Sequence, residues 1–469
     1  MSHTDATVYA VMSLPGLPSF ISRAFPRTRG LPFIGNLLDM RKGRIDFYSR
    51  MAEEHGSPFV MRLGLVQLIV LTDPNRIHEV LVERPADYDK SVTLSLFAEP
   101  ILGKGLLTSE ASFHQRQKRM VGPALSPKRL AGYAETMIDC AERSAARMIA
   151  SQSVDFLEEL MRATLEIVGR TLFDVDLTSD ASTVAPAITE AMEALTAQFY
   201  TLLPLPPPVP TSHNRRLAKA VKVLDNVVYR ILEERRRSVG DRGDVLSILL
   251  AAQDDDGSQM TDKQLRDEVM TMFLAGHETT ANAVTWALYL LGRNPAVFDK
   301  ARAEVDQVVG DRRLTFQDLK SLPYCLQVFK ETMRLYPPAH TLSRVALRDT
   351  TIAAERVSKG QIVVMSPYAM HRRTDYFAEP TRFLPDRFLP EREATQVKHA
   401  FLPFGAGPRV CVGNHFAMLE GQILLAVYLQ KLHFALSRAE PAEADPLITL
   451  RPKNGVPARV SARRPSQPS

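Results

Sequence analysis

The feature that most constrains this chain is an uninterrupted helical pattern over residues 261–294. Apolar residues recur there at three- and four-residue spacing, which is typical of an α-helix. Thr261 and Gln264 can form a capping box at its start, and Asn294-Pro295 ends it. At about 1.5 Å per residue the helix would be roughly 50 Å long, the width of a whole domain. Such a helix must pass through the centre of the fold, so residues near its middle can face a buried cofactor.

The rest of the chain predicts a mainly α fold with a small β-rich side. A helical pattern covers most of residues 74–310, whereas residues 59–71 and 342–367 are typical of short strands. No Gly/Ser-rich linker or low-complexity tract divides the sequence. We therefore predict a single domain over residues 26–462, with an N-terminal tail at 1–25 and a C-terminal tail at 463–469.

Composition excludes disorder and several kinds of site. With 45% hydrophobic and 24% charged residues, the chain can bury a sizeable core. Cys140, Cys325 and Cys411 lie far apart, which indicates neither a disulfide framework nor a zinc site and fits a reducing, cytoplasmic location. The apolar stretch 8–25 is broken by two prolines, so we predict no signal peptide and no membrane anchor. The net charge of +5 is spread along the chain, so we expect no nucleic-acid partner.

The sharpest chemical signal is the segment 404–413, Phe-Gly-Ala-Gly-Pro-Arg-Val-Cys-Val-Gly, which precedes another helical pattern. It places the Cys411 thiol at a helix start, where the dipole and free N–H groups should lower its pKa. A thiolate can be the axial ligand of ferric haem. Gly405, Gly407 and Gly413 allow a tight loop and close approach of the backbone to a flat cofactor. A lone cysteine is usually a small buried hydrophobe, but here the whole pattern is intact.

This segment resembles the haem-binding loop of the cytochrome P450 family, which has phenylalanine, two glycines, a basic residue and cysteine in this order. Other family segments follow in the right order over almost the entire chain. The resemblance implies a soluble bacterial monooxygenase with haem b between the long helix and the Cys411 loop. It would insert one oxygen atom from O₂ into an apolar C–H or C=C bond. Phe404, Gly405 and Cys411 would then bind the haem, with Cys411 as the iron ligand.

A second segment, residues 275–280 (Ala-Gly-His-Glu-Thr-Thr), matches the oxygen-activating segment of the family. Ala275, Gly276 and Thr279 fall on one stripe of the helix. The two small residues leave room for dioxygen at the haem, and the Thr279 hydroxyl can relay a proton. Because cleaving dioxygen needs two protons, we predict that Thr279 and Glu278 form a proton relay. The simpler alternative is a threonine that bonds back to the preceding helical turn.

Four further positions are expected to hold the haem carboxylates. His114 and Lys118 lie four residues apart on one helix face, where the family commonly has an aromatic residue or histidine and then arginine. Lys118 is a departure, because lysine cannot make the two-pronged contact of arginine. Arg344 and Arg409 match the other two carboxylate-pairing positions.

Other charged residues are interpreted as structural. Glu331 and Arg334 share a helix face at offset three, a pair that alone is worth less than ~1 kcal/mol. The resemblance adds Arg387 as the third member of a structural charged triad. We interpret His371 as part of an ordinary solvated strand end.

The expected electron donor is a separate protein, because the chain carries no flavin or iron–sulfur segment. The resemblance implies NAD(P)H and a ferredoxin or flavodoxin with its reductase. A basic cluster on and after the helix near Cys411 could steer an acidic partner, although a solvated helix face is the alternative. Its members are Arg116, Lys118, Arg119, Lys128 and Arg129.

The family's substrate-contact segments are mostly apolar here, which indicates a lipophilic small molecule such as a fatty acid, terpenoid, steroid or polyketide. They correspond to residues 94–97, 199–203, Met272 and Phe273, 340–342, and the region around Asn454 and Gly455. The proline-rich stretch 204–210 between two helices is either a lid over the substrate entrance or a surface turn.

Two alternatives to a monooxygenase stay open at this point. One is a haem-thiolate enzyme that uses peroxide, or that isomerises or dehydrates its substrate. The intact Glu278-Thr279 pair argues against it, because such enzymes often dispense with the proton relay. The other is a haem-binding sensor without turnover.

Overall fold

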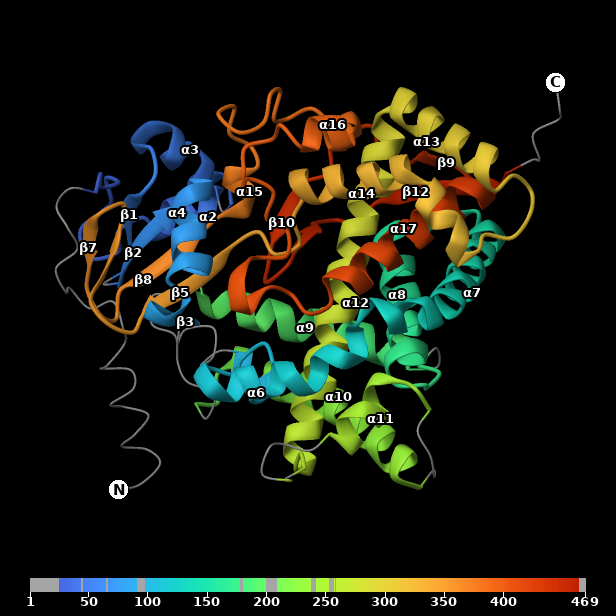
Figure 1. The fold of residues 1–469 in the computed structure, drawn as a ribbon, viewed down its shortest axis with the longest axis horizontal. Coiled ribbons are helices and arrows are strands. Elements are labelled where there is room, and N and C mark those ends of the chain that lie inside the picture. The colour runs from blue at the N-terminus through green and yellow to red at the C-terminus, as the bar shows by residue number, and fades with distance from the viewer. Residues whose placement is uncertain are drawn as a thin grey trace.

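Long helices fill one side of the molecule and a small sheet lies at the other, as Figure 1 shows. This confirms the predicted mainly α fold with a small β-rich side. The computed structural model describes residues 25–43, 45–64, 66–90, 98–177, 180–199, 209–237, 242–252, 257 and 259–463.

The central element is α12 (Asp262–Arg293), which passes through the middle of the helical side (Figure 1). Its predicted capping box is confirmed: the Thr261 hydroxyl accepts from the Gln264 N–H, and the Gln264 side chain accepts from the Thr261 N–H. Helix α13 (Pro295–Val308) follows at once, because a proline is favourable in the first helical turn but not inside a helix. Helices α8 (Phe156–Leu172) and α17 (Asn414–Lys431) pack against α12. The predicted length and central place of this helix are therefore correct.

The remaining helices either pack on the helical side or, like α2, α3 and α4, lie beside the main sheet (Figure 1). Among the helices that the structure describes, none combines a bilayer-spanning length with sufficient apolar character. Their bounds are α2 (Leu37–Gly43), α3 (Asp46–His55), α4 (Pro74–His78), α6 (Ala111–Val121), α7 (Pro127–Ser151), α9 (Ala181–Phe199), α10 (Ser212–Arg237), α11 (Val245–Ala251), α14 (Pro323–Leu335), α15 (Pro367–Met370) and α16 (Pro390–Glu393).

The main sheet has the strand order β1-β2-β8-β5-β3, in which only β2 and β8 run parallel. Its third strand in sequence, β3, lies within the stretch expected to be helical, so that part of the prediction is wrong. Local periodicity misses it because its partner, β5, comes some 250 residues later, and Lys90 pairs with Arg344 across the two strands. The bounds are β1 (Phe59–Leu63), β2 (Val66–Leu71), β3 (Tyr88–Lys90), β5 (Leu342–Ala346) and β8 (Ile362–Met365).

The described residues also form smaller sheets. One has the order β4-β12-β9, and two hairpins pair β10 with β11 and β6 with β7. The β10/β11 hairpin lies against α12, where the Trp286 indole donates to the Leu450 carbonyl at 3.1 Å. The bounds are β4 (Ser153–Asp155), β6 (Thr350–Ile352), β7 (Glu355–Val357), β9 (Leu432–Leu436), β10 (Ala444–Pro446), β11 (Leu450–Pro452) and β12 (Pro457–Ala462).

The charged triad is present and lies in the core. Arg334 and Glu331 are fully buried and form an ion pair at 2.7 Å, and Arg387 reaches the same carboxylate at 3.1 Å. Arg334 also donates to the carbonyls of His371 and Pro380. His371 itself is fully buried and accepts from the Leu402 N–H, so its interpretation as a solvated strand end is wrong.

Candidate functional site

The segment 404–413 is a tight loop that leads into α17. The Cys411 N–H donates to the Phe404 carbonyl at 3.0 Å and closes the loop. Gly405 and Gly407 have φ angles of +70° and +71°, a conformation that favours glycine. A side chain at Gly407 would collide with the Leu81 carbonyl. Gly407 therefore allows the loop to pack closely against the Leu81 backbone, whereas the expected neighbour is a cofactor.

The Cys411 thiol is accessible, yet protein atoms surround it on most sides, and this burial raises its pKa. The Gly413 N–H and the positive charge of Lys118 act in the opposite direction. The prediction that a helix start lowers the pKa of the Cys411 thiol is thus wrong for the protein without a cofactor. Helix α17 begins only at Asn414, three residues beyond the thiol, and a single loop N–H does not offset desolvation.

Basic side chains gather here from α6, from β5 and from the loop itself. Lys118 on α6 donates to the Pro408 carbonyl at 2.7 Å. Arg409 donates to the Ser109 carbonyl at 2.6 Å and pairs with Asp89 at 2.5 Å. His114 lies one turn before Lys118, and Arg344 extends from β5. The four predicted carboxylate-pairing residues are thus brought to one place.

Lys90 on β3 is a fifth member that the sequence did not reveal. It is buried, and its ammonium donates to the carbonyls of Leu106 and Leu107. Burial and the charge of Arg409 lower its pKa to about 7. No local signal marked it, because residues 88–90 lie in the stretch expected to be helical.

The cluster has more positive than negative charge. Burial and then Arg409 lower the pKa of His114 to about 3 and the pKa of Arg344 to about 10. His114 is therefore neutral at pH 7 and can act as a hydrogen-bond donor. Asp89 is the carboxylate that pairs directly with the cluster. Desolvated cations that repel one another favour a bound anion, so the cluster suits a ligand with carboxylates.

The middle of α12 faces accessible space within the fold. From Leu265 to Leu291 every residue is buried except Ala275, Gly276 and Thr279. These three residues share one helical stripe, as predicted. Accessible positions halfway along an otherwise buried helix indicate an internal site, lined there by two small residues and a hydroxyl.

The proposed relay residues have separate partners. The Thr279 hydroxyl donates to the Ala275 carbonyl at 2.6 Å, which is the back-bonded geometry considered as the simpler alternative. Its oxygen lone pairs remain available on the accessible side. Glu278 is buried, and its carboxylate accepts from the Thr449 hydroxyl at 2.5 Å. Among the described residues, no hydrogen bond directly joins the side chains of Glu278 and Thr279.

A second buried acid, Glu420 on α17, was not recognised from the sequence. Burial raises its pKa to about 8, and the Thr280 hydroxyl lies close enough to act against this shift. Neither carboxylate oxygen has a partner with hydrogen-bond geometry among the described residues. The available sequence signal was the position of Glu420, which comes nine residues after Cys411 on the buried face of the following helix.

The expected substrate-contact segments are only partly described. Residues 94–97 and 200–203 lie outside the described residues, as does 204–208 of the proline-rich stretch. Phe273 is fully buried, and Gly455 packs against Asp155. The contact of Asn454 and Gly455 with a substrate stays a prediction.

The tip of the β10/β11 hairpin, shortly before them in the chain, contacts α12. The Leu447 carbonyl contacts the His340 ring at 2.9 Å, and Thr449 contacts α12. Ile448 between them is partly accessible. The tip lies only a few residues before the predicted position, but local pattern does not give the register of a short hairpin.

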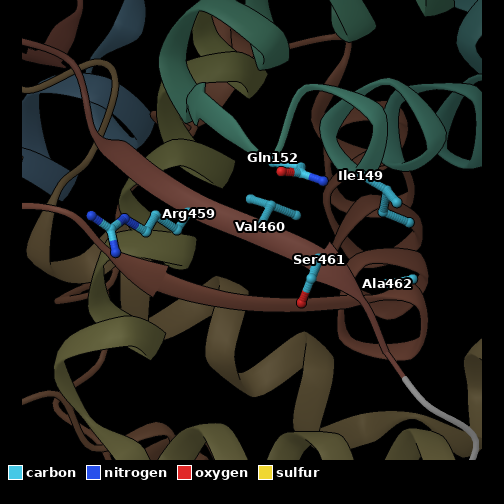
Figure 2. A pocket seen from close by; sticks show the side chains of 6 residues that line it. All are labelled: Ile149, Gln152, Arg459, Val460, Ser461 and Ala462. Atoms are coloured by element: carbon cyan, nitrogen blue, oxygen red, sulfur yellow. The ribbon is translucent and has the colours of Figure 1, made fainter.

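A surface hollow shares no residue with this site. Figure 2 shows it between the end of α7 and β12. Its lining offers one guanidinium and no carboxylate, thiol or imidazole, so we assign the chemistry to the Cys411 loop and α12. The lining residues are Ile149, Gln152, Arg459, Val460, Ser461 and Ala462.

Together these residues fit a haem. Cys411 is an accessible thiol donor, Ala275 and Gly276 are small and accessible, and the basic cluster matches a ligand with two carboxylates. Such a combination of a soft sulfur donor and nearby cations suits a planar, anionic iron cofactor.

Comparison with known proteins extends this result over most of the chain. A family model described as cytochrome P450 matches residues 26–457. Cyclooctatin synthase from Streptomyces melanosporofaciens is 37% identical over 400 residues, 85% of this chain and 87% of that protein. Pentalenene oxygenase from Streptomyces avermitilis is 30% identical over 440 residues, 93% and 97% of the two chains. Cyclooctat-9-en-7-ol 5-monooxygenase from Streptomyces melanosporofaciens is 31% identical over 401 residues, 84% and 86%.

Proposed function

The chain belongs to the cytochrome P450 family and is a haem monooxygenase of small lipophilic molecules, and we propose that its substrate is an unsaturated cyclic hydrocarbon or alcohol. The observation that carries the proposal is the accessible stripe of Ala275, Gly276 and Thr279 in the middle of the otherwise buried α12. The names of two relatives, pentalenene oxygenase and cyclooctat-9-en-7-ol 5-monooxygenase, support this class of compound. Leu342 and Ile448 are apolar residues in the segments that would contact it.

The haem would be held by two sets of residues. Cys411 would hold the iron through its sulfur, and the carboxylates would meet the cluster of Lys90, His114, Lys118, Arg344 and Arg409. Phe404, Gly405, Ala275 and Gly276 would lie against the cofactor. When bound, the haem supplies the iron that activates dioxygen.

Proton handling would depend on α12. Because the Thr279 hydroxyl donates its proton to the Ala275 carbonyl, its oxygen can accept a hydrogen bond from the accessible side. It can therefore order water or hold a proton at Oγ1. Glu278 would supply protons from the buried side of the same helix.

Electrons would enter beside Cys411. The contact between Lys118 and Pro408 brings α6 against the thiol loop, so a partner on α6 has a short path to the iron. The basic residues of α6 and the start of α7 would steer an acidic ferredoxin or flavodoxin to this surface. NAD(P)H would supply electrons to the reductase of that partner. These basic residues are Arg116, Lys118, Arg119, Lys128 and Arg129.

Turnover with a surrogate ferredoxin, its reductase and NAD(P)H tests the proposal. We expect oxygenated products from cyclic alkenes in preference to linear fatty acids. The Cys411→Ala protein should give none and should lose the red-shifted carbon monoxide band of thiolate ligation. Thr279→Ala should bind substrate normally but divert reducing equivalents to peroxide. Equal turnover with peroxide alone, or a preference for linear fatty acids, would overturn the reaction or the substrate class, respectively.

A further inference from the structure

Glu278 is held by a hydrogen-bonded chain that begins on its own helix. Asn282, one turn further along α12, donates from its side-chain amide to the Thr449 hydroxyl at 3.0 Å. Thr449 in turn donates to Oε1 of Glu278 at 2.5 Å. All three side chains are buried, with exposed fractions of 0%, 8% and 4% for Asn282, Thr449 and Glu278.

The direction of this chain is fixed by the atoms present. An amide NH₂ can only donate, so the Thr449 oxygen must be the acceptor from Asn282. A hydroxyl has a single proton, which Thr449 then gives to Glu278. Oε1 of Glu278 is thereby engaged as an acceptor, which favours Oε2 as the oxygen that gains or loses the proton.

The charges around Glu278 come from the hairpin and from α9. Burial raises its pKa, whereas the Thr449 hydroxyl and the positive charge of Arg451 lower it. Arg451 is itself paired with Glu193 of α9 at 2.9 Å and lies 3.7 Å from Asp445 of β10. The neighbouring His277 is turned to the Met161 carbonyl of α8 at 2.8 Å, and burial lowers its pKa to about 4. Thr449 is thus the uncharged group that meets the carboxyl directly.

We propose that Thr449 and Asn282 are positioning residues for proton transfer by Glu278: they lock one carboxylate oxygen as an acceptor and leave the other as the proton-carrying atom. This inference rests on the proposed role of Glu278. It assigns a specific function to the hairpin tip, which approaches α12 from a part of the chain more than 160 residues away.

Removing the hydroxyl should change the proton chemistry without emptying the site. Thr449→Val keeps the shape of the side chain but leaves Glu278 without its donor, which favours the protonated carboxyl. The pH profile of turnover should move to higher pH by about one unit, the size expected for one hydrogen bond to a carboxylate. The solvent deuterium isotope effect should change with it, while substrate affinity stays within about twofold. Thr449→Ser should restore the parent profile.

Asn282→Leu and a matched control sharpen the test. Without the amide the Thr449 hydroxyl can still reach Glu278 but is no longer fixed, so a smaller shift in the same direction is expected. Thr285→Val is the control, because Thr285 is also fully buried on α12 and its hydroxyl donates to the Ala281 carbonyl of the same helix at 2.7 Å. It should leave the pH profile unchanged.

The Glu278→Gln background separates this inference from the proposed function. There, Thr449→Val should have no further effect on the pH profile or the isotope effect. An equal shift in that background would mean that Thr449 acts on another group. No shift for Thr449→Val, in an enzyme that Glu278→Gln impairs, would overturn the positioning role alone. Normal coupling and pH dependence in Glu278→Gln itself would overturn the proposed role of Glu278.

Discussion

Two clusters of charge in this molecule differ in how completely they are neutralised. In the triad of Glu331, Arg334 and Arg387, the cations meet a carboxylate and backbone carbonyls, and the central pair is fully buried. In the cluster near Cys411 the basic groups depress one another's pKa values, with Asp89 as the directly paired carboxylate. A closed network is suited to support the fold. A cluster left with excess positive charge is suited to bind an anion. Sequence patterns alone do not distinguish these two kinds of cluster.

Breaking the closed network should have the largest effect on folding. Glu331→Gln leaves the Arg334 guanidinium buried without a counter-charge, which should lower the free energy of unfolding by ~3–5 kcal/mol. Urea denaturation of the purified protein measures this difference, and a low soluble yield would be its extreme form. Lys330→Met is the matched control on the same helix, because its ion pair with Glu393 is partly exposed and worth less than ~1 kcal/mol. Equal unfolding midpoints for the two variants would show that the triad is not a structural centre.

Breaking the open cluster should instead affect cofactor retention. Arg344→Leu removes one charged donor to a haem carboxylate, worth ~1.5–3 kcal/mol, so haem transfer to an acceptor protein should accelerate about tenfold or more. The haem-free variant should be no less stable than its parent, because burial already disfavours the charged form of Arg344. A variant that loses stability and keeps its haem would reverse the assignment of the two clusters.

The open cluster also predicts a pH dependence of the haem-free protein. Burial lowers the pKa of Lys90 to about 7, so between pH 7 and about 10.5 the unfolded chain binds a proton that the folded protein lacks. Stability should therefore rise with pH in this window, with a slope of up to about 1.4 kcal/mol per pH unit. Above pH 8 the neighbouring Glu268, whose burial raises its pKa to about 8, is mostly ionised in both states.

Thermal unfolding of Lys90→Met from pH 8 to 10 checks the sign. Its absolute stability will change because the bonds to Leu106 and Leu107 are lost, but its slope should be flatter than that of the parent. An unchanged slope would mean that Lys90 is protonated in the folded protein at these pH values.

The smallest effect is expected at Lys118. Arginine can keep the bond to the Pro408 carbonyl and add a second donor, so Lys118→Arg should change haem retention by no more than about twofold. Lys118→Glu should lose haem faster, because it puts a negative charge beside the carboxylates. Equal retention in both variants would make Lys118 only a support of the thiol loop.

The sequence determined what depends on near neighbours in the chain. The length and capping of α12, the stripe of Ala275, Gly276 and Thr279, and the Cys411 loop all follow from spacings of a few residues, because helical geometry fixes them locally. The pair Glu331 and Arg334 could likewise be predicted, since both lie on one helix face.

Tertiary structure decided which distant residues complete the site. Lys90 faces Arg344, Thr449 meets Glu278, and Glu420 lies beside Thr280, in each case across at least 140 residues of chain. Burial also reversed expectations for His371 and for the Cys411 thiol, because desolvation depends on everything packed around a group. Local pattern carries neither the register of paired strands nor the depth of a side chain, and these two quantities set the partners and the proton affinity of the residues in the site.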